Sequence, residues 1–236
     1  MANSVLFILL DKSEPEDIEM VQERYGPLVT HFSRNCSVFD VRTMYDALTA
    51  LRENTWKAVI VLEPIVVGLK FKPLSDMLVS FVKDGGTLIF EGRFGRLLRP
   101  SDLNKYFRDV WNLSWTYGGA LSEEWEYTYN PLYPTNQFLE YQGGLPRTCR
   151  FEGVLLGNVP MMDRVFVPKF PLITEKEQMG PHMSMGGITL PRGRDWHGLS
   201  PAVFSRYEKG YLGWVGEDRP IYRPWTIELL AAMCGI

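Results

Sequence analysis

Charged side chains that could take part in catalysis lie in two turns, each of which follows a predicted strand. In the first, an apolar run ending at Glu91 is followed by a glycine-flanked turn that carries Arg93. A guanidinium at such a turn can form a bidentate pair with a carboxylate. In the second, the apolar run 210–215 is followed by Glu217. Arg93 and Glu217 are therefore predicted to be catalytic residues.

Further candidates follow other predicted strands. Ligands of open α/β sheets bind beyond the carboxyl ends of the strands, so side chains at those ends should converge in space. The ligand-binding residues predicted on this ground are Asp11, Glu63, Glu91 and Phe94. The carboxylate that pairs with Arg93 could belong to a ligand. It could instead be Glu63, Glu91 or Glu217, and Arg93 would then belong to an internal Arg–Glu network that fills the site without binding a ligand.

A third catalytic candidate is His197, in the segment Asp195-Trp-His-Gly198. A histidine close to an acid can act as a general acid or base. A single histidine in a loop can equally have no role in the chemistry. No histidine has metal-ligand spacing to a partner, so no metal site is expected. A phosphate-binding glycine loop is missing after the first strand, so no nucleotide cofactor is expected either.

Aromatic and methionine side chains are enriched in the second half of the chain. Trp115, Tyr117 and Trp125 could form the wall of a ligand pocket, because they combine an apolar body with a polar tip. The alternative is that they are ordinary core residues. Met183 and Met185 lie in the segment 174–198, which is rich in Gly and Pro. We interpret this segment either as a lid over the ligand or as a plain surface loop.

Strands and helices alternate in the first half of the sequence. Continuous apolar runs predict strands at 4–10, 37–42, 58–62 and 87–90, and helical spacing of apolar residues predicts helices ending near 26, 56, 84 and 111. This order is typical of a parallel sheet covered by helices on both faces. Further strands are predicted around 125–129, within 154–168, and as a hairpin of 202–206 with 211–215. A final helix begins near Pro224.

Composition narrows the class of protein. The 236 residues are 45% hydrophobic and 22% charged, which is ordinary for a globular chain, and we expect one domain spanning 1–236. The net charge of −3 gives no reason to expect nucleic acid or a membrane surface as partner. Three dispersed cysteines and the absence of a basic leader predict a cytoplasmic protein without disulfides.

The order of these elements resembles the class I glutamine amidotransferase-like (flavodoxin-like) superfamily, and it is most similar to stand-alone fungal members. The runs 74–95 and 210–217 carry the resemblance. It implies a three-layer α/β sandwich with a mainly parallel sheet and additional C-terminal strands. It also implies a Cys-His-Glu triad, but here Arg93 stands in the place of the cysteine and Val215 in that of the histidine. Only Glu217 keeps its carboxylate.

Glutaminase chemistry is therefore not expected, because it needs a thiolate activated by an imidazole. Esterase chemistry is not expected either, because the sequence has no Gly-x-Ser-x-Gly motif. One hypothesis is a cofactor-independent enzyme of specialised metabolism, such as a cyclase, isomerase or pericyclase, that acts on an apolar or amphipathic small molecule. The alternative is a non-catalytic module that binds a small molecule or a protein. A homo-oligomer is a further option.

Overall fold

A six-stranded sheet forms the centre of the protein in this computed structural model, which describes residues 3–10, 15–91, 94–130, 132, 145–169, 184–185, 188–189, 198–217 and 222–236. The strand order is β10-β11-β4-β3-β1-β2. All neighbours are parallel except β10 and β11, which form an antiparallel hairpin. The strands are β1 (Ser4–Ile8), β2 (Ser37–Val41), β3 (Ala58–Val61), β4 (Thr87–Glu91), β10 (Ala202–Tyr207) and β11 (Gly210–Val215).

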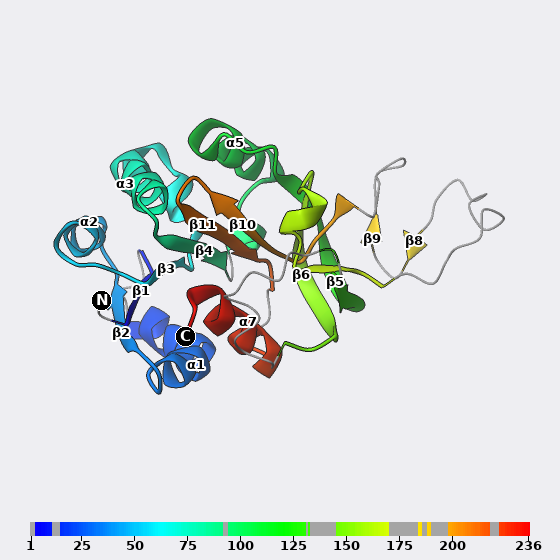
Figure 1. Cartoon of the computed structure of the whole chain (residues 1–236), viewed down its shortest axis with the longest axis horizontal. Coiled ribbons are helices and arrows are strands. Elements are labelled where there is room, and N and C mark those ends of the chain that lie inside the picture. Colours follow the sequence, from blue (N-terminus) through cyan, green and yellow to red (C-terminus); the bar gives the residue numbers. More distant parts are fainter. Residues whose placement is uncertain are drawn as a thin grey trace.

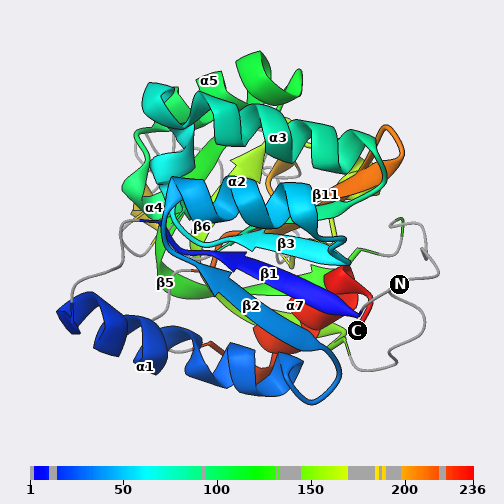
Figure 2. The same ribbon diagram turned by 90° about the vertical axis from the view of Figure 1, so that its left-hand side faces the viewer.

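Helices cover both faces of this sheet, as Figures 1 and 2 show. One face carries α1 (Pro15–Phe32) and α7 (Pro224–Cys234), and the other carries α2 (Met44–Glu53), α3 (Lys72–Lys83) and α5 (Pro100–Trp111). Successive side chains of a strand point to opposite faces, so the buried residues divide into two clusters. Ile60 and Ile89 pack on the α1/α7 side, and Val61 and Phe90 pack on the α3/α5 side.

A second, three-stranded sheet lies beside β10 (Figure 1). It consists of β6 (Thr148–Gly157), β5 (Thr116–Tyr129) and β7 (Phe166–Pro168), in that order and antiparallel. Isolated bridges join the two sheets, among them one from Gly153 to Glu217. The remaining elements are the short α4 (Phe94–Leu97), the 3-10 turns η1 (Pro64–Val67), η2 (Leu69–Phe71) and η3 (Met161–Asp163), and the strand pair β8 (Ser184–Met185) and β9 (Ile188–Thr189).

The fold class expected from the sequence is confirmed, since the molecule is an α/β sandwich with a mostly parallel sheet and added antiparallel strands. The predicted end of the first helix was wrong. The first helix does not end near Gly26 but continues through Pro27 to Phe32. Tyr25, Leu28 and Phe32 are buried against the sheet, and this packing outweighs the low helix propensity of glycine and proline. Within the described residues, no helix combines the length and apolarity needed to cross a bilayer.

Candidate functional site

The sheet separates the three glutamates that were expected to converge at its carboxyl edge. In the strand registers, Glu91 lies opposite Val215, and Phe90 lies opposite Val61. Because side chains alternate along a strand, Glu91 projects with Val215 toward α1 and α7, whereas Glu63, two residues after Val61, projects toward α3 and α5. Glu217 contacts α7 as well. The carboxyl edge therefore has a glutamate pair on one face and Glu63 on the other.

The glutamate pair, Glu91 and Glu217, is fully buried and held by the beginning of α7. The Tyr222 hydroxyl donates a hydrogen bond to Glu91, and the Thr226 hydroxyl donates one to Glu217. Arg223 Nε lies 3.4 Å from Glu217 Oε1. Buried carboxylates need such partners, because an isolated charge away from water is very costly. The pair is thus part of the contact between the sheet and α7.

Protonation around the glutamate pair argues against a nucleophile there. Burial, and then the Glu91 charge, raise the pKa of Tyr222 well above its ordinary value, so its hydroxyl keeps the proton that it donates to Glu91. Burial, followed by the charge of Glu217, raises the pKa of the Cys149 thiol to about 12. Only a thiolate attacks or binds metal readily. Cys149 is therefore unreactive at neutral pH.

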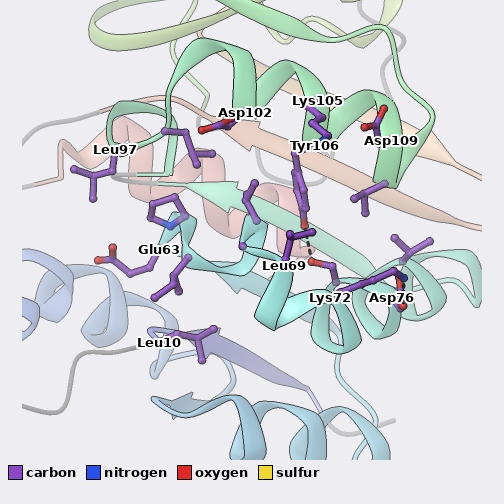
Figure 3. Close-up of a pocket in the computed structure, with 18 residues that line it drawn as sticks. Leu10, Glu63, Leu69, Lys72, Asp76, Leu97, Asp102, Lys105, Tyr106 and Asp109 are labelled. Atoms are coloured by element: carbon purple, nitrogen blue, oxygen red, sulfur yellow. Dashed lines mark hydrogen bonds and ion pairs between the residues drawn. The ribbon is translucent and has the colours of Figure 1, made fainter.

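Glu63 lines a groove of about 980 Å³ between α3 and α5 (Figure 3). Apolar side chains from five elements and the adjoining loops form most of its wall, and charged side chains stand at its rim. The apolar members are Leu10, Pro64, Ile65, Val67, Leu69, Val79, Leu97, Leu98 and Val110. Leu69 and Leu97 at the rim are 92% and 49% exposed. Exposed leucines beside an apolar cavity are typical of a binding surface rather than of a closed core.

Few polar groups enter the wall of the groove. Tyr106 reaches from α5 toward α3, where its hydroxyl lies 3.4 Å from Ser75 Oγ (Figure 3). Ser75 Oγ donates to the carbonyl of Val66 at 2.9 Å. Glu63 is 6% exposed and lies at the end of the groove near Leu97. An apolar cavity with a small number of polar groups matches the usual composition of small-molecule sites.

Of the other predicted site residues, those that the structure describes are not gathered around this groove. Phe94 is buried between Phe90 and Trp214, and Trp115 packs against Phe107 with ring centroids 5.2 Å apart. Tyr117 and Trp125 are partly buried on β5. Four predicted residues lie outside the described residues: Asp11, Arg93, Met183 and His197. Met185 belongs to β8, and its side chain is not described. Roles for these residues in binding or catalysis remain predictions.

Sequence reasoning missed the residues that define both faces of the carboxyl edge. Tyr222, Arg223 and Thr226 precede or open α7, and a polar cluster next to the helix-starting Pro224 is a signal that could have indicated them. Tyr106 was assigned only to a helical apolar face, although it lines the groove and its hydroxyl lies beside Ser75 Oγ. In the described part of the chain, no group of three or more His, Cys, Asp or Glu side chains is arranged to hold a metal ion.

Comparisons with known proteins place the fold. No protein-family model matches the sequence, and no curated protein matches it. A putative ThuA-like protein from Bacteroides uniformis aligns over 98% of this chain and 89% of its own, with a TM-score of 0.59 and 9% identity. A putative ThuA-like protein from Parabacteroides merdae aligns over 99% and 89%, with a TM-score of 0.51 and 11% identity.

A third similar structure is a β-galactosidase from the Antarctic haloarchaeon Halorubrum lacusprofundi, with a TM-score of 0.55 and 15% identity over 99% of this chain. This chain spans only 30% of that enzyme. At these identities the likeness shows the fold alone. ThuA-like proteins are class I glutamine amidotransferase-like, so the resemblance inferred from the sequence is confirmed as a resemblance of fold.

Proposed function

We propose that the groove between α3 and α5 binds an apolar or amphipathic small molecule. The observation that carries the proposal is a cavity of about 980 Å³ at the carboxyl end of β3, with an apolar wall and a charged rim. Small-molecule sites typically occupy about 300–1,000 Å³ and lie outside the carboxyl ends of strands in such sheets. The groove meets both criteria.

The contacts and burial of the residues on the two faces of the sheet support this choice of site. On the α1/α7 face, the glutamate pair is packed against the hydroxyl groups of Tyr222 and Thr226 and the guanidinium of Arg223. Those contacts stabilise the folded chain and leave the pair buried. On the α3/α5 face, Val79 and Val110 line the groove and are only half-buried. A ligand that covers them gains about 25 cal/mol for each Å² of apolar surface removed from water.

The first test fills the groove. Val110→Trp places an indole in it and is expected to weaken binding of the neutral apolar dye Nile red at least about tenfold, which corresponds to roughly 1.4 kcal/mol. Fluorescence titration of the dye into wild type and variant measures this. Val29→Trp is the matched control, because Val29 is 37% exposed on α1, on the opposite side of the sheet. Equal dye affinity of Val110→Trp and wild type would rule out the groove.

A second candidate function is a cofactor-independent enzyme acting on the same molecule. The observation in its favour is Glu63, a carboxylate 6% exposed in the wall of an apolar cavity. A carboxylate in such surroundings can serve as a general base. It would remove a proton from a carbon acid and return it elsewhere, which is the elementary step of an isomerase. This is the chemistry closest to the cyclase, isomerase or pericyclase of specialised metabolism suggested by the sequence.

This candidate is tested by exchange of the α-hydrogens of 2-tetralone for deuterium, followed by NMR in heavy water. The carboxylate takes the α-proton to leave an enolate, and the carboxyl group, once exchanged with solvent, returns a deuteron. Glu63→Gln is expected to lower the rate at least about 100-fold and to leave Nile red affinity unchanged. Asp102→Asn, at the exposed rim of the same groove, is the control. If wild-type protein exchanges the α-hydrogens no faster than buffer does, the enzymatic candidate is wrong and only the binding function remains.

A further inference from the structure

The strand β2 forms one edge of the six-stranded sheet, away from the groove. We propose that this edge pairs with the β2 strand of a second copy of this chain. The two strands run antiparallel about a two-fold axis, so that one continuous sheet passes through both molecules. Phe39 lies on the axis, opposite the Phe39 of the second copy. The proposal does not depend on the ligand of the groove.

The outer edge of β2 presents backbone groups that can bind another strand. The N–H of Ser37 and the carbonyl of Val41 form hydrogen bonds of 2.9 Å with the residues just before and just after β1. Backbone groups of successive residues point to opposite edges of a strand, so Val38 and Asp40 direct theirs away from β1. Among the described residues, no strand pairs with this edge. Such an edge is a template for a further strand.

The common devices that prevent edge pairing are weak in β2. These devices include lysine or proline in the strand and bulges that twist the edge away. The segment Ser37–Val41 contains neither lysine nor proline, and its register with β1 is regular. Its single charged residue, Asp40, is bound to Arg42 at 3.1 Å. In Figure 2, β2 lies in front, between α2 above it and α1 below it. A second copy can therefore approach this edge.

Phe39 supplies an apolar contact at the edge. Its side chain is 50% exposed, and its ring packs edge-on against Trp56, with ring centroids 5.3 Å apart. Phe39 lies opposite Leu6 in the register, and Leu6 packs in the core on the α2/α3/α5 face. Phe39 therefore projects on that face as well. Aromatic side chains are enriched in protein interfaces, and two such rings in contact attract each other beyond the area that they bury.

Two-fold symmetry limits the possible registers. In a symmetric pair, if residue i faces residue j, then j also faces i. The outward backbone groups of Val38 and Asp40 have to face outward groups of the second copy. Asp40 facing Asp40 places like charges directly opposite each other, which is destabilising. Val38 facing Val38 puts Phe39 opposite Ser37 and leaves the two rings apart.

One register avoids both problems and uses the whole strand. When Val38 faces Asp40, the two Phe39 residues form the central, non-hydrogen-bonded pair, in which side chains approach most closely. Pairing Asp40 with Arg42 would instead extend the ladder to Thr43. The Thr43 side chain and carbonyl already cap the beginning of α2 by binding the backbone N–H groups of Asp46 and Ala47. The register centred on Phe39 is therefore assigned.

Sedimentation over a series of protein concentrations tests the pairing. The wild-type protein is expected to form a dimer. Phe39→Lys places two ammonium groups opposite each other at the axis and removes an aromatic contact, so it should weaken dimerisation at least about 30-fold. Met162→Lys is the matched control, because Met162 is 51% exposed on η3, outside the proposed interface. It should dimerise as the wild type does.

Cross-linking tests the register. The Cα atoms of a central, non-hydrogen-bonded pair are about 4.5 Å apart, within the range that a disulfide spans. Phe39→Cys should therefore give a covalent dimer on a non-reducing gel after mild oxidation. The two Asp40 residues are diagonal neighbours, about 7–8 Å apart, so Asp40→Cys should link poorly. Wild-type protein, which contains Cys36, measures the background.

Each outcome supports or contradicts the proposal. A monomer at every concentration would overturn it and leave the edge to a strand of a different protein. A wild-type dimer that Phe39→Lys does not weaken would place the interface elsewhere. Efficient linking of Asp40→Cys without linking of Phe39→Cys would refute the register. If Phe39→Lys does not fold, as judged by its thermal melt, linking of Phe39→Cys decides.

Discussion

Arg223→Ala is expected to lower the free energy of unfolding by about 3–5 kcal/mol. Arg223 Nε lies 3.4 Å from Glu217 Oε1, and the Glu217 side chain is fully buried, whereas that of Arg223 is 17% exposed. Arg223 also binds Glu124 at 2.5 Å and donates to the carbonyl of Arg150. Removing the guanidinium leaves a buried carboxylate with less compensation, and this cost exceeds the value of the original ion pair. Denaturant unfolding followed by tryptophan fluorescence measures the loss.

Arg108→Ala is the matched control for that variant. Arg108 forms a closer pair with Asp109, at 2.8 Å, but the two side chains are 68% and 43% exposed. Solvent and salt screen such pairs, so the unfolding midpoint should barely move. Equal midpoint shifts in Arg223→Ala and Arg108→Ala would show that α7 does not hold the charge of Glu217. The assignment of the glutamate pair to a stabilising contact would then be wrong.

Gly216→Ala is expected to lower the free energy of unfolding by roughly 3 kcal/mol or more, near the upper end of overpacking effects. A Cβ at this position would lie 1.9 Å from the carbonyl oxygen of Val154 and 2.8 Å from the indole nitrogen of Trp214. The backbone of Gly216 accepts a hydrogen bond of 2.8 Å from Val154 N. The clash therefore separates β6 from the end of β11, where Glu217 follows.

Gly26→Ala is the control, and it is expected to raise the free energy of unfolding instead of lowering it. Gly26 lies inside α1, and a Cβ there would meet nothing within 4 Å. Alanine is the better helix former, so this variant should gain about 0.5–1 kcal/mol. Urea unfolding of both variants gives the comparison. A loss in Gly216→Ala below about 1 kcal/mol would mean that the two sheets adjust easily, and that the glycine is not required by the close approach to Val154.

The sequence predicts the core better than it predicts the site, and the reason is periodicity. The run Ala58–Val61 is buried throughout, as a continuous apolar run indicates, and Leu74, Leu78 and Val82 form the buried face of α3. These patterns are local, because each depends on residues within one strand or helix. They suffice to establish a mainly parallel sheet between two layers of helices.

The site depends on contacts between distant segments, which no local pattern contains. Tyr222 and Glu91 are 131 residues apart in the chain and meet only because α7 returns to the carboxyl edge of β4. Whether Glu63 shares a face with Glu91 depends on strand register. Trp115 could be core or pocket wall by composition, and its burial against Phe107 favours core packing. The groove itself arises from the spacing of α3 and α5.

The contacts that stabilise the sheet and the groove proposed to bind a ligand lie on opposite faces of the sheet. Contacts of α7 with Glu91 and Glu217 stabilise the sheet on one side, while the groove on the other side can exchange ligand without disturbing them. Variants of Arg223 and Gly216 should therefore change stability and leave the dye affinity of the folded protein intact. Val110→Trp should instead change the dye affinity. Stability and dye binding measured on these three variants check this separation.

The most direct measurement is a crystal structure of the protein with Nile red bound. We expect electron density for the dye between α3 and α5, in contact with Val79, Val110 and Tyr106. The protein has a second hollow, of about 530 Å³, between α1 and α7, which Tyr222 and His31 line. Density there instead, with the groove between α3 and α5 empty, would contradict the central claim.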